Sequence, residues 1–82
     1  MILTFEELRQ LKDKLPSGSM QKIADELKID VQHVRNYFGA DHYSQKNIPG
    51  VHYEKGGPGG GIVKLYDTTI YDCAQKMLKN RN

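Results

Sequence analysis

The sequence has one cysteine, no long apolar run and little excess charge. Cys73 has no partner for an internal disulfide, and a chain of this size in an oxidising compartment usually needs several bridges. The apolar stretch Met1-Ile2-Leu3 is too short for a signal sequence and runs into Glu6 and Glu7. No segment is long and apolar enough to span a membrane. We therefore expect a cytoplasmic protein without a membrane partner.

The charges nearly balance. Twelve Lys and Arg face ten Asp and Glu, a formal net charge of +2, which is weak for a protein that neutralises phosphates. Moderate apolar content and charges mixed along the whole chain also exclude the disordered and membrane classes. Because 82 residues support only one compact core, we expect a single domain over residues 1–82.

The first segment has the pattern of an amphipathic helix. Thr4 and Glu7 have the spacing of a capping box, in which each side chain bonds the backbone amide of the other residue. Apolar residues then recur at helical spacing until Pro16. The sequence predicts a helix over 5–15.

Two further helices follow closely. Ser19 is a suitable cap for a helix over 20–28, and Asp30 is a suitable cap for a helix over 31–38. Gly39 then ends the third helix. The polar stretch that follows, up to residue 50, has no clear periodicity and is interpreted as an irregular connection.

The second half of the chain predicts a hairpin and a last helix. Segments 51–55 and 62–66 alternate in hydropathy and flank the glycine-rich run 56–61, which is typical of two strands joined by a mobile tip. The alternation places one set of side chains on a common face: Val51, Tyr53, Val63 and Leu65. A final helix over 69–79 can be capped by Asp67, Thr68 or Thr69.

Residues 20–38 resemble the bacterial helix-turn-helix pattern. A small residue, Ala24, stands where the two helices approach, and Ile29 lies in the turn. The other apolar positions that match the pattern are Ile23, Leu27, Val34, Tyr37 and Phe38. The chain departs from the family at Lys28, where glycine is usual because the residue is left-handed, a conformation that costs a side chain with a Cβ roughly 1–2 kcal/mol.

The hairpin after the third helix extends this likeness, so that the whole chain resembles small bacterial winged helix-turn-helix DNA-binding proteins. The implied fold is mainly α with a β-hairpin: a three-helix core followed by a two-stranded wing and a C-terminal helix. Two features depart from the family. The connection between the third helix and the hairpin is long, and no early strand is visible between the first two helices.

The resemblance implies a site on the outward face of the third helix. Side chains there would read base edges in the major groove of double-stranded DNA, and arginine suits guanine while asparagine and glutamine suit adenine. These base-contacting candidates are Gln32, His33, Arg35 and Asn36. The alternative is that they are ordinary solvated polar residues, which any exposed helix face carries.

Phosphate contacts are expected from two regions. The start of the second helix offers free amides and the positive end of the helix dipole, with Ser17, Ser19 and Gln21. The wing offers Lys46, Lys55 and Lys64. Surface lysines are mostly solvated and without a partner, so each of these residues is weak evidence alone.

A transcriptional regulator that acts without a cofactor is the function that this resemblance implies. A second copy would supply a second half-site, and the last helix offers a surface for it with Ile70, Tyr71, Met77 and Leu78. These residues close the monomer core equally well. A winged helix used for protein association without DNA binding is the alternative function, because the near-neutral charge removes the electrostatic argument for DNA.

Other chemistry finds little support in the sequence. No pair among His33, His42, His52 and Cys73 has the spacing of a zinc site, so we expect no metal. The run 56–61 lacks the Gly-Lys-Ser/Thr and the helix of a phosphate-binding loop. With so small a core and no nucleophile beside a base, we expect no enzyme. Cys73 lies on the apolar stripe of the last helix and is interpreted as a buried structural residue.

Overall fold

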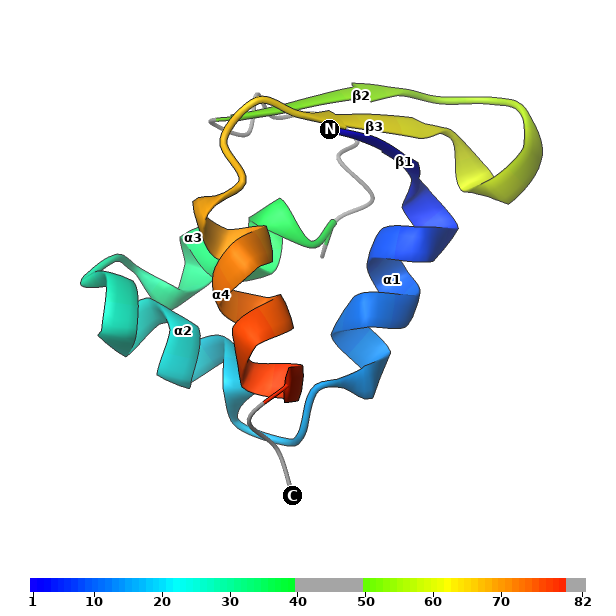
Figure 1. Ribbon diagram of the computed structural model, residues 1–82. Coiled ribbons are helices and arrows are strands. Elements are labelled where there is room, and N and C mark those ends of the chain that lie inside the picture. The colour runs from blue at the N-terminus through cyan, green and yellow to red at the C-terminus, as the bar shows by residue number, and fades with distance from the viewer. Residues whose placement is uncertain (40–49, 80–82) are drawn as a thin grey trace.

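The computed structural model describes residues 1–39 and 50–79. Within them the chain forms a mainly helical fold with a small antiparallel sheet, and all four helices lie on one side of that sheet (Figure 1). The elements in chain order are β1 (Ile2–Thr4), α1 (Phe5–Lys14), α2 (Ser19–Leu27), α3 (Val31–Tyr37), β2 (Val51–Glu54), a 3-10 turn η1 (Pro58–Gly60), β3 (Ile62–Leu65) and α4 (Thr69–Lys79). The predicted helices are confirmed with ends within two residues of those expected. The irregular connection expected up to residue 50 lies outside the described residues except for Gly50.

Local side-chain chemistry starts α1 as the sequence predicts. The Thr4 hydroxyl accepts a hydrogen bond from the Glu7 amide at 3.1 Å, and the Glu7 carboxylate accepts one from the Thr4 amide at 2.9 Å. This capping box satisfies two backbone donors at the helix end. Phe5, Leu8 and Leu11 are then buried along one side of α1, so the cap fixes which face of the helix meets the core.

The hairpin has the common apolar face that the sequence predicts. In the antiparallel pair of β2 and β3, Val51 faces Leu65 and Tyr53 faces Val63, so these apolar side chains share the face that meets the helices. The next residues along the strands alternate to the outer face, where His52 lies opposite Lys64. Hydropathy alternation therefore identified the inner face of each strand, and the structure adds the register.

The prediction that the wing has two strands is wrong, because β1 completes a three-stranded sheet in the order β1-β3-β2. In this pairing Leu3 lies opposite Val63, and Ile2 lies opposite Lys64. The third strand precedes α1 instead of lying between the first two helices. It closes the chain into one unit by pairing residues about sixty positions apart.

The glycine-rich tip, for which the sequence predicts mobility, folds back on the start of α1. The Gly61 carbonyl accepts from the Phe5 amide at 2.9 Å, and the Gly60 carbonyl accepts from the Tyr53 hydroxyl at 2.6 Å. A Cβ built on Gly59 would lie 2.8 Å from the Cβ of Thr4, which is closer than real carbon contacts. Glycine is needed in this loop because the backbone passes so close to α1.

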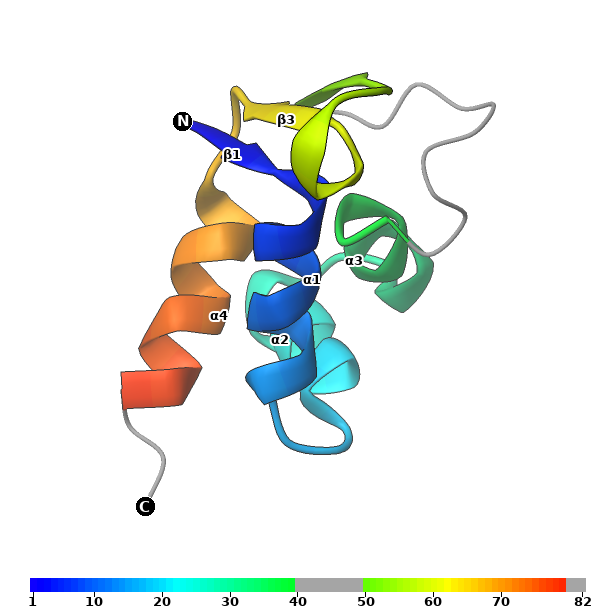
Figure 2. The same cartoon turned by 90° about the vertical axis from the view of Figure 1, so that its right-hand side faces the viewer.

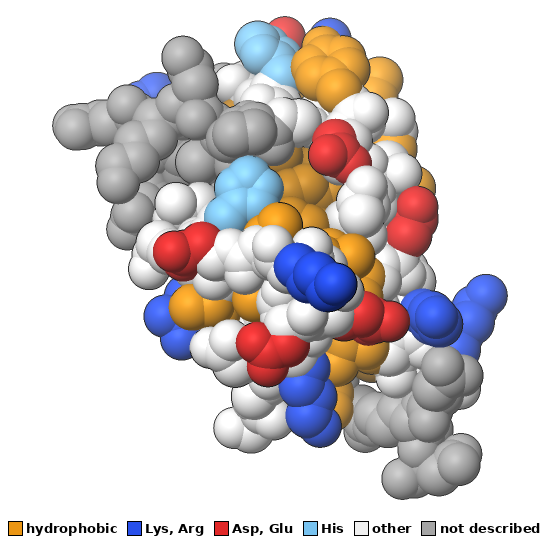
Figure 3. Space-filling model, turned by 90° about the vertical axis from the view of Figure 1, so that its left-hand side faces the viewer, with side chains coloured by type: hydrophobic (Ala, Val, Ile, Leu, Met, Phe, Trp, Pro, Cys, Tyr) orange, Lys and Arg blue, Asp and Glu red, His pale blue; other side chains and the backbone are white. Residues whose placement is uncertain are grey.

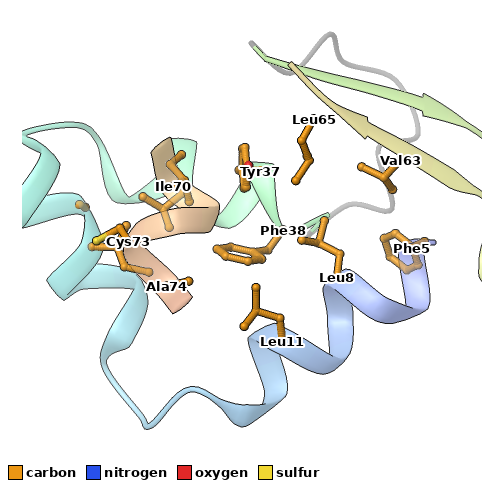
Figure 4. Packing of buried hydrophobic residues seen from close by; sticks show 13 residues of the cluster. Phe5, Leu8, Leu11, Tyr37, Phe38, Val63, Leu65, Ile70, Cys73 and Ala74 are labelled. Carbon is orange, nitrogen blue, oxygen red and sulfur yellow. The ribbon is translucent and has the colours of Figure 1, made fainter. Parts of the chain in front are cut away.

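One apolar core joins the sheet to the helices. Leu8 from α1, Phe38 after α3 and Leu65 from β3 meet between the layers, and Cys73 and Ala74 of α4 pack on the side of α2 (Figure 4). Tyr37 is also buried, and its hydroxyl donates to the Asp67 carbonyl at 3.0 Å. This bond ties the end of α3 to the segment before α4.

Within the described parts of the chain, no helix combines the length and apolar character needed to cross a bilayer.

Candidate nucleic-acid interface

A three-residue turn, residues 28–30, holds α2 and α3 together. Lys28 adopts the left-handed conformation at φ 59° and ψ 46°, as the pattern predicts. Its amide and that of Ile29, at 3.0 Å, both donate to the Ala24 carbonyl. The turn is thereby fixed against the last turn of α2, although a lysine stands where the conformation favours glycine.

Buried residues fix the position of α3. Ala24 is only 1% exposed, which lets the backbones of α2 and α3 approach closely. Ile23 and Val34 are fully buried on the facing sides, and Tyr37 with Phe38 anchors the end of α3 in the core. Because one side of α3 is held in this way, the other side faces outward as a unit.

The outward side of α3 carries a row of polar side chains, which we call the polar row: Gln32, Arg35 and Asn36. The Asp30 carboxylate caps the helix by accepting from the Gln32 amide at 2.7 Å. The Gln32 side-chain amide in turn donates to the Asn36 side-chain oxygen at 3.0 Å. Gln32 and Arg35 are exposed and Asn36 is half-buried. The structure thus brings together three of the four residues predicted to contact bases.

His33, the fourth, lies toward the segment between β3 and α4. It is half-buried, and it is close enough to Asp67 for its charge to act on that carboxyl. Hydrogen bonds from the Thr69 side chain and amide hold the pKa of Asp67 below its ordinary value, and the charge of His33 acts in the same direction. His33 therefore lies within electrostatic reach of an acidic group.

A hollow of about 270 Å³ adjoins the start of α2. Its lining includes three of the predicted phosphate contacts, Ser17, Ser19 and Gln21, together with Lys12 of α1 and Arg35 of α3. The N-cap of this helix is Gly18, which has no side chain to cap the first amides. Basic groups from two other helices thus surround a helix end that favours anions.

Sequence reasoning missed Lys12 as part of this hollow. It stands twenty-three residues before Arg35 in the chain, and only the packing of α1 beside the α2 end brings it there. A basic residue in the last turn of a helix is common because it favours the helix dipole. Nothing in the sequence around Lys12 distinguished it from an ordinary basic residue in the last turn of a helix.

Ser19 has a different place from the one predicted. The N-cap of α2 is Gly18, so the expectation that Ser19 caps this helix is wrong. Its side chain is 2% exposed, and its hydroxyl donates to the Pro16 carbonyl at 2.6 Å. The hydroxyl stabilises the turn between α1 and α2, and Ser19 is also one of the residues that line the hollow.

The structure describes two of the three predicted wing lysines, Lys55 and Lys64. Lys64 lies on the outer face of the sheet, since its neighbours Val63 and Leu65 point into the core. Its ammonium is 3.9 Å from the Glu54 carboxylate, so its charge is partly balanced. Lys55 follows β2 and is exposed, and Lys46 lies outside the described residues.

The predicted dimer surface on α4 is only partly available. Ile70 is 5% exposed and belongs to the monomer core, so it does not face a partner, contrary to that expectation. Tyr71, Met77 and Leu78 are half-buried and pack against the same core. Cys73 is buried as predicted, and its thiol donates to the Glu26 carboxylate at 3.2 Å. Burial raises the pKa of Cys73 to about 11, and Glu26 acts in the same direction.

Charges of both signs are interspersed on the face that carries α2 and α3 (Figure 3). Lysine and arginine therefore form no broad basic surface there, in keeping with the small net charge. Among the described side chains, no three His, Cys, Asp or Glu residues gather as a metal ion would require. His42, one of the histidines considered as a ligand, lies outside that part of the chain.

Comparison with known protein families, curated proteins and solved structures finds no match to this chain.

Proposed function

We propose that the protein is a sequence-specific double-stranded DNA-binding module of the winged helix-turn-helix type that regulates transcription. In this proposal α3 enters the major groove and the start of α2 lies against the phosphate backbone. The observation that carries the proposal is the α2–turn–α3 unit, in which a left-handed Lys28 and a buried Ala24 hold α3 with its polar side outward. Such a unit presents the second helix to a groove of DNA.

The side chains on α3 suit base readout. Arg35 is exposed and able to bond guanine through two N–H groups, and the amides of Gln32 and Asn36 suit adenine. The bond between these two amides restrains both side chains, which lowers the entropy lost when they bind. Readout by a restrained row of polar groups favours a specific site over random sequence.

The hollow at the start of α2 supplies the backbone contact. Ser17, Gln21 and Lys12 line it beside the free amides at the helix end, and phosphate contacts of this kind fix the register of a protein on the duplex. Arg35 borders both the hollow and the polar row. We expect this arginine to contribute most to binding.

The test is fluorescence anisotropy with a labelled duplex, after selection of bound sequences from random DNA. Affinity should fall as salt rises, with a slope of about 0.9 per phosphate contacted. Arg35→Ala should weaken binding to the selected site by about 1–3 kcal/mol and relax its base preference. Arg9→Ala is the matched control, because Arg9 is exposed on α1 and does not line the hollow. It should change affinity little.

Absence of binding at low salt, or an equal effect of Arg35→Ala and Arg9→Ala, would overturn the proposal. A second candidate is protein association through the same fold, without DNA. The interspersed charges of Figure 3 favour it, because like-charged surfaces do not dominate this face. The two functions separate in the same assay, since protein association predicts no salt-dependent binding to any duplex.

A further inference from the structure

β1 is an edge strand with one residue whose backbone groups point outward. The strand order β1-β3-β2 leaves the other side of β1 without a partner strand among the described residues, as Figure 2 shows at the edge of the sheet. The Met1 carbonyl accepts a hydrogen bond from the Leu65 amide, and the Phe5 amide donates one to the Gly61 carbonyl. Both residues therefore bond toward β3. By the alternation of an antiparallel pair, the N–H and C=O groups of Ile2 and Thr4 then point away from β3.

Thr4 is already used at this edge. Its amide donates to the Glu7 carboxylate, and the chain turns into α1 at the next residue. Ile2 is thus the one residue of β1 that offers both an outward N–H and an outward C=O. Because only one residue of β1 offers both outward backbone groups, this edge fits a partner strand that is equally short.

Apolar surface surrounds the same edge. Ile2 is 69% exposed and Met1 is 55% exposed. Beneath β1 a groove of about 350 Å³ lies between α1 and α4, with Leu3, Leu11, Tyr71 and Leu78 among its lining residues. An occupant must therefore offer backbone hydrogen bonds to Ile2 and an apolar side chain above the groove.

We propose that the occupant is a second copy of this chain, paired antiparallel through β1 with Ile2 opposite Ile2. A pair centred on Ile2 exchanges both backbone bonds, and it is symmetric, as a twofold dimer requires. It also places Met1 of each copy opposite Leu3 of the other, on the side of the groove. The two sheets then join into one sheet of six strands.

The size of this contact sets its strength. The pairing rests on Met1, Ile2 and Leu3 of each copy, whereas a stable interface uses about 20–30 residues a side. The pairing is therefore weak in isolation and becomes strong when both copies lie on one DNA molecule, where the second contact is intramolecular. The role of the pairing on DNA rests on the proposed DNA binding, but the pairing itself is measurable without DNA.

The test is disulfide crosslinking of Ile2→Cys without DNA, at high protein concentration. Two Cα atoms in a hydrogen-bonded antiparallel pair lie about 5.5 Å apart, within the range that a disulfide spans. Ile2→Cys should give a crosslinked dimer under mild oxidation much faster than Ile62→Cys, the matched control on the outer face of the central strand. The wild-type chain should give none, because Cys73 is buried.

Equal or slower crosslinking of Ile2→Cys relative to Ile62→Cys would overturn the proposal, and a faster Ile62→Cys would assign the contact to the outer sheet face. As a second measure, sedimentation should show a weak monomer–dimer equilibrium that Ile2→Lys abolishes, because two like charges would meet at the twofold axis. Ile62→Lys should leave the equilibrium unchanged. Dimerisation that survives Ile2→Lys contradicts the pairing whether or not the protein binds DNA.

Discussion

The carbonyl of Ala24 accepts the amide of Ile29 at 3.0 Å, across a left-handed lysine. This bond ends α2 and sets the direction in which α3 leaves. It therefore couples the stability of the fold to the presentation of the polar row on α3. Substitution of Lys28, which lies between Ala24 and Ile29 in the chain, tests this relationship most directly.

Lys28→Gly should stabilise the protein by about 1 kcal/mol, because glycine adopts the left-handed conformation without a Cβ penalty. For a domain of this size that raises the midpoint of thermal unfolding by about 4–8 °C. Lys28→Ala, which removes the charge but keeps the Cβ, should not stabilise. Lys22→Gly, at an exposed position inside α2, should destabilise by about 1 kcal/mol. Stabilisation by both Lys28 variants would assign the effect to charge.

Tyr37→Phe should lower the free energy of unfolding by about 1 kcal/mol, because the Asp67 carbonyl loses the hydroxyl that donates to it. The effect should depend on pH. Burial raises the pKa of Tyr37 above its ordinary value of 10.0, so the folded protein keeps a proton that the unfolded chain releases. The contribution is fully present below about pH 10 and is lost as pH rises further, by up to about 1.4 kcal/mol per pH unit.

Denaturant unfolding between pH 8 and 11 measures this loss. The wild type should lose more stability than Tyr37→Phe over the alkaline part of the range. Tyr66→Phe is the control, since Tyr66 is the most exposed of the large apolar residues. Parallel curves for the wild type and Tyr37→Phe would show that the buried hydroxyl does not control alkaline unfolding.

Cys73 should react slowly with iodoacetamide in the folded protein. Its pKa is raised from 9.0 to about 11, which lowers the thiolate fraction about 100-fold, and burial limits access in addition. Labelling in urea should restore the rate of an ordinary thiol. Rapid labelling without urea would mean that α4 separates readily from α2 at the contact with Glu26.

Gly61→Ala should destabilise the protein more than Gly56→Ala. Both glycines have positive φ, so each alanine carries a backbone strain of about 1–2 kcal/mol. A Cβ at Gly61 would in addition lie 2.7 Å from the Glu54 carbonyl oxygen, whereas one at Gly56 meets nothing within 4 Å. The extra crowding should add about 1–3 kcal/mol. Equal unfolding free energies for the two variants would mean that the loop does not pack as described.

Local chemistry made much of the fold predictable. Thr4, Glu7 and Asp30 cap helices through residues two or three positions away, and such contacts are legible in the sequence. Strict alternation in β2 and β3 likewise identified the side chains that share the inner face of the hairpin. Each of these features depends on neighbours in the chain.

Features that depend on distant neighbours were missed. β1 has only three residues, and its partner strand begins about sixty positions later, so no periodicity marks it as a strand. Gly18, not Ser19, is the N-cap of α2, because the Ser19 hydroxyl donates to the Pro16 carbonyl in the preceding turn. In the candidate site, the outward row of α3 followed from the helical period, whereas the approach of Lys12 to Arg35 depends on how α1 packs.

The pairing of β1 with β3 also orders the assembly of the chain. The helices α1 to α3 form from contacts that are close in sequence, but β1 stays without a partner until residues 61–65 are present. Closing so long a loop is slow compared with forming a helix. During synthesis, then, the apolar Ile2 and Leu3 stay without their partner strand until β3 has been made, and α4 follows β3 in the chain.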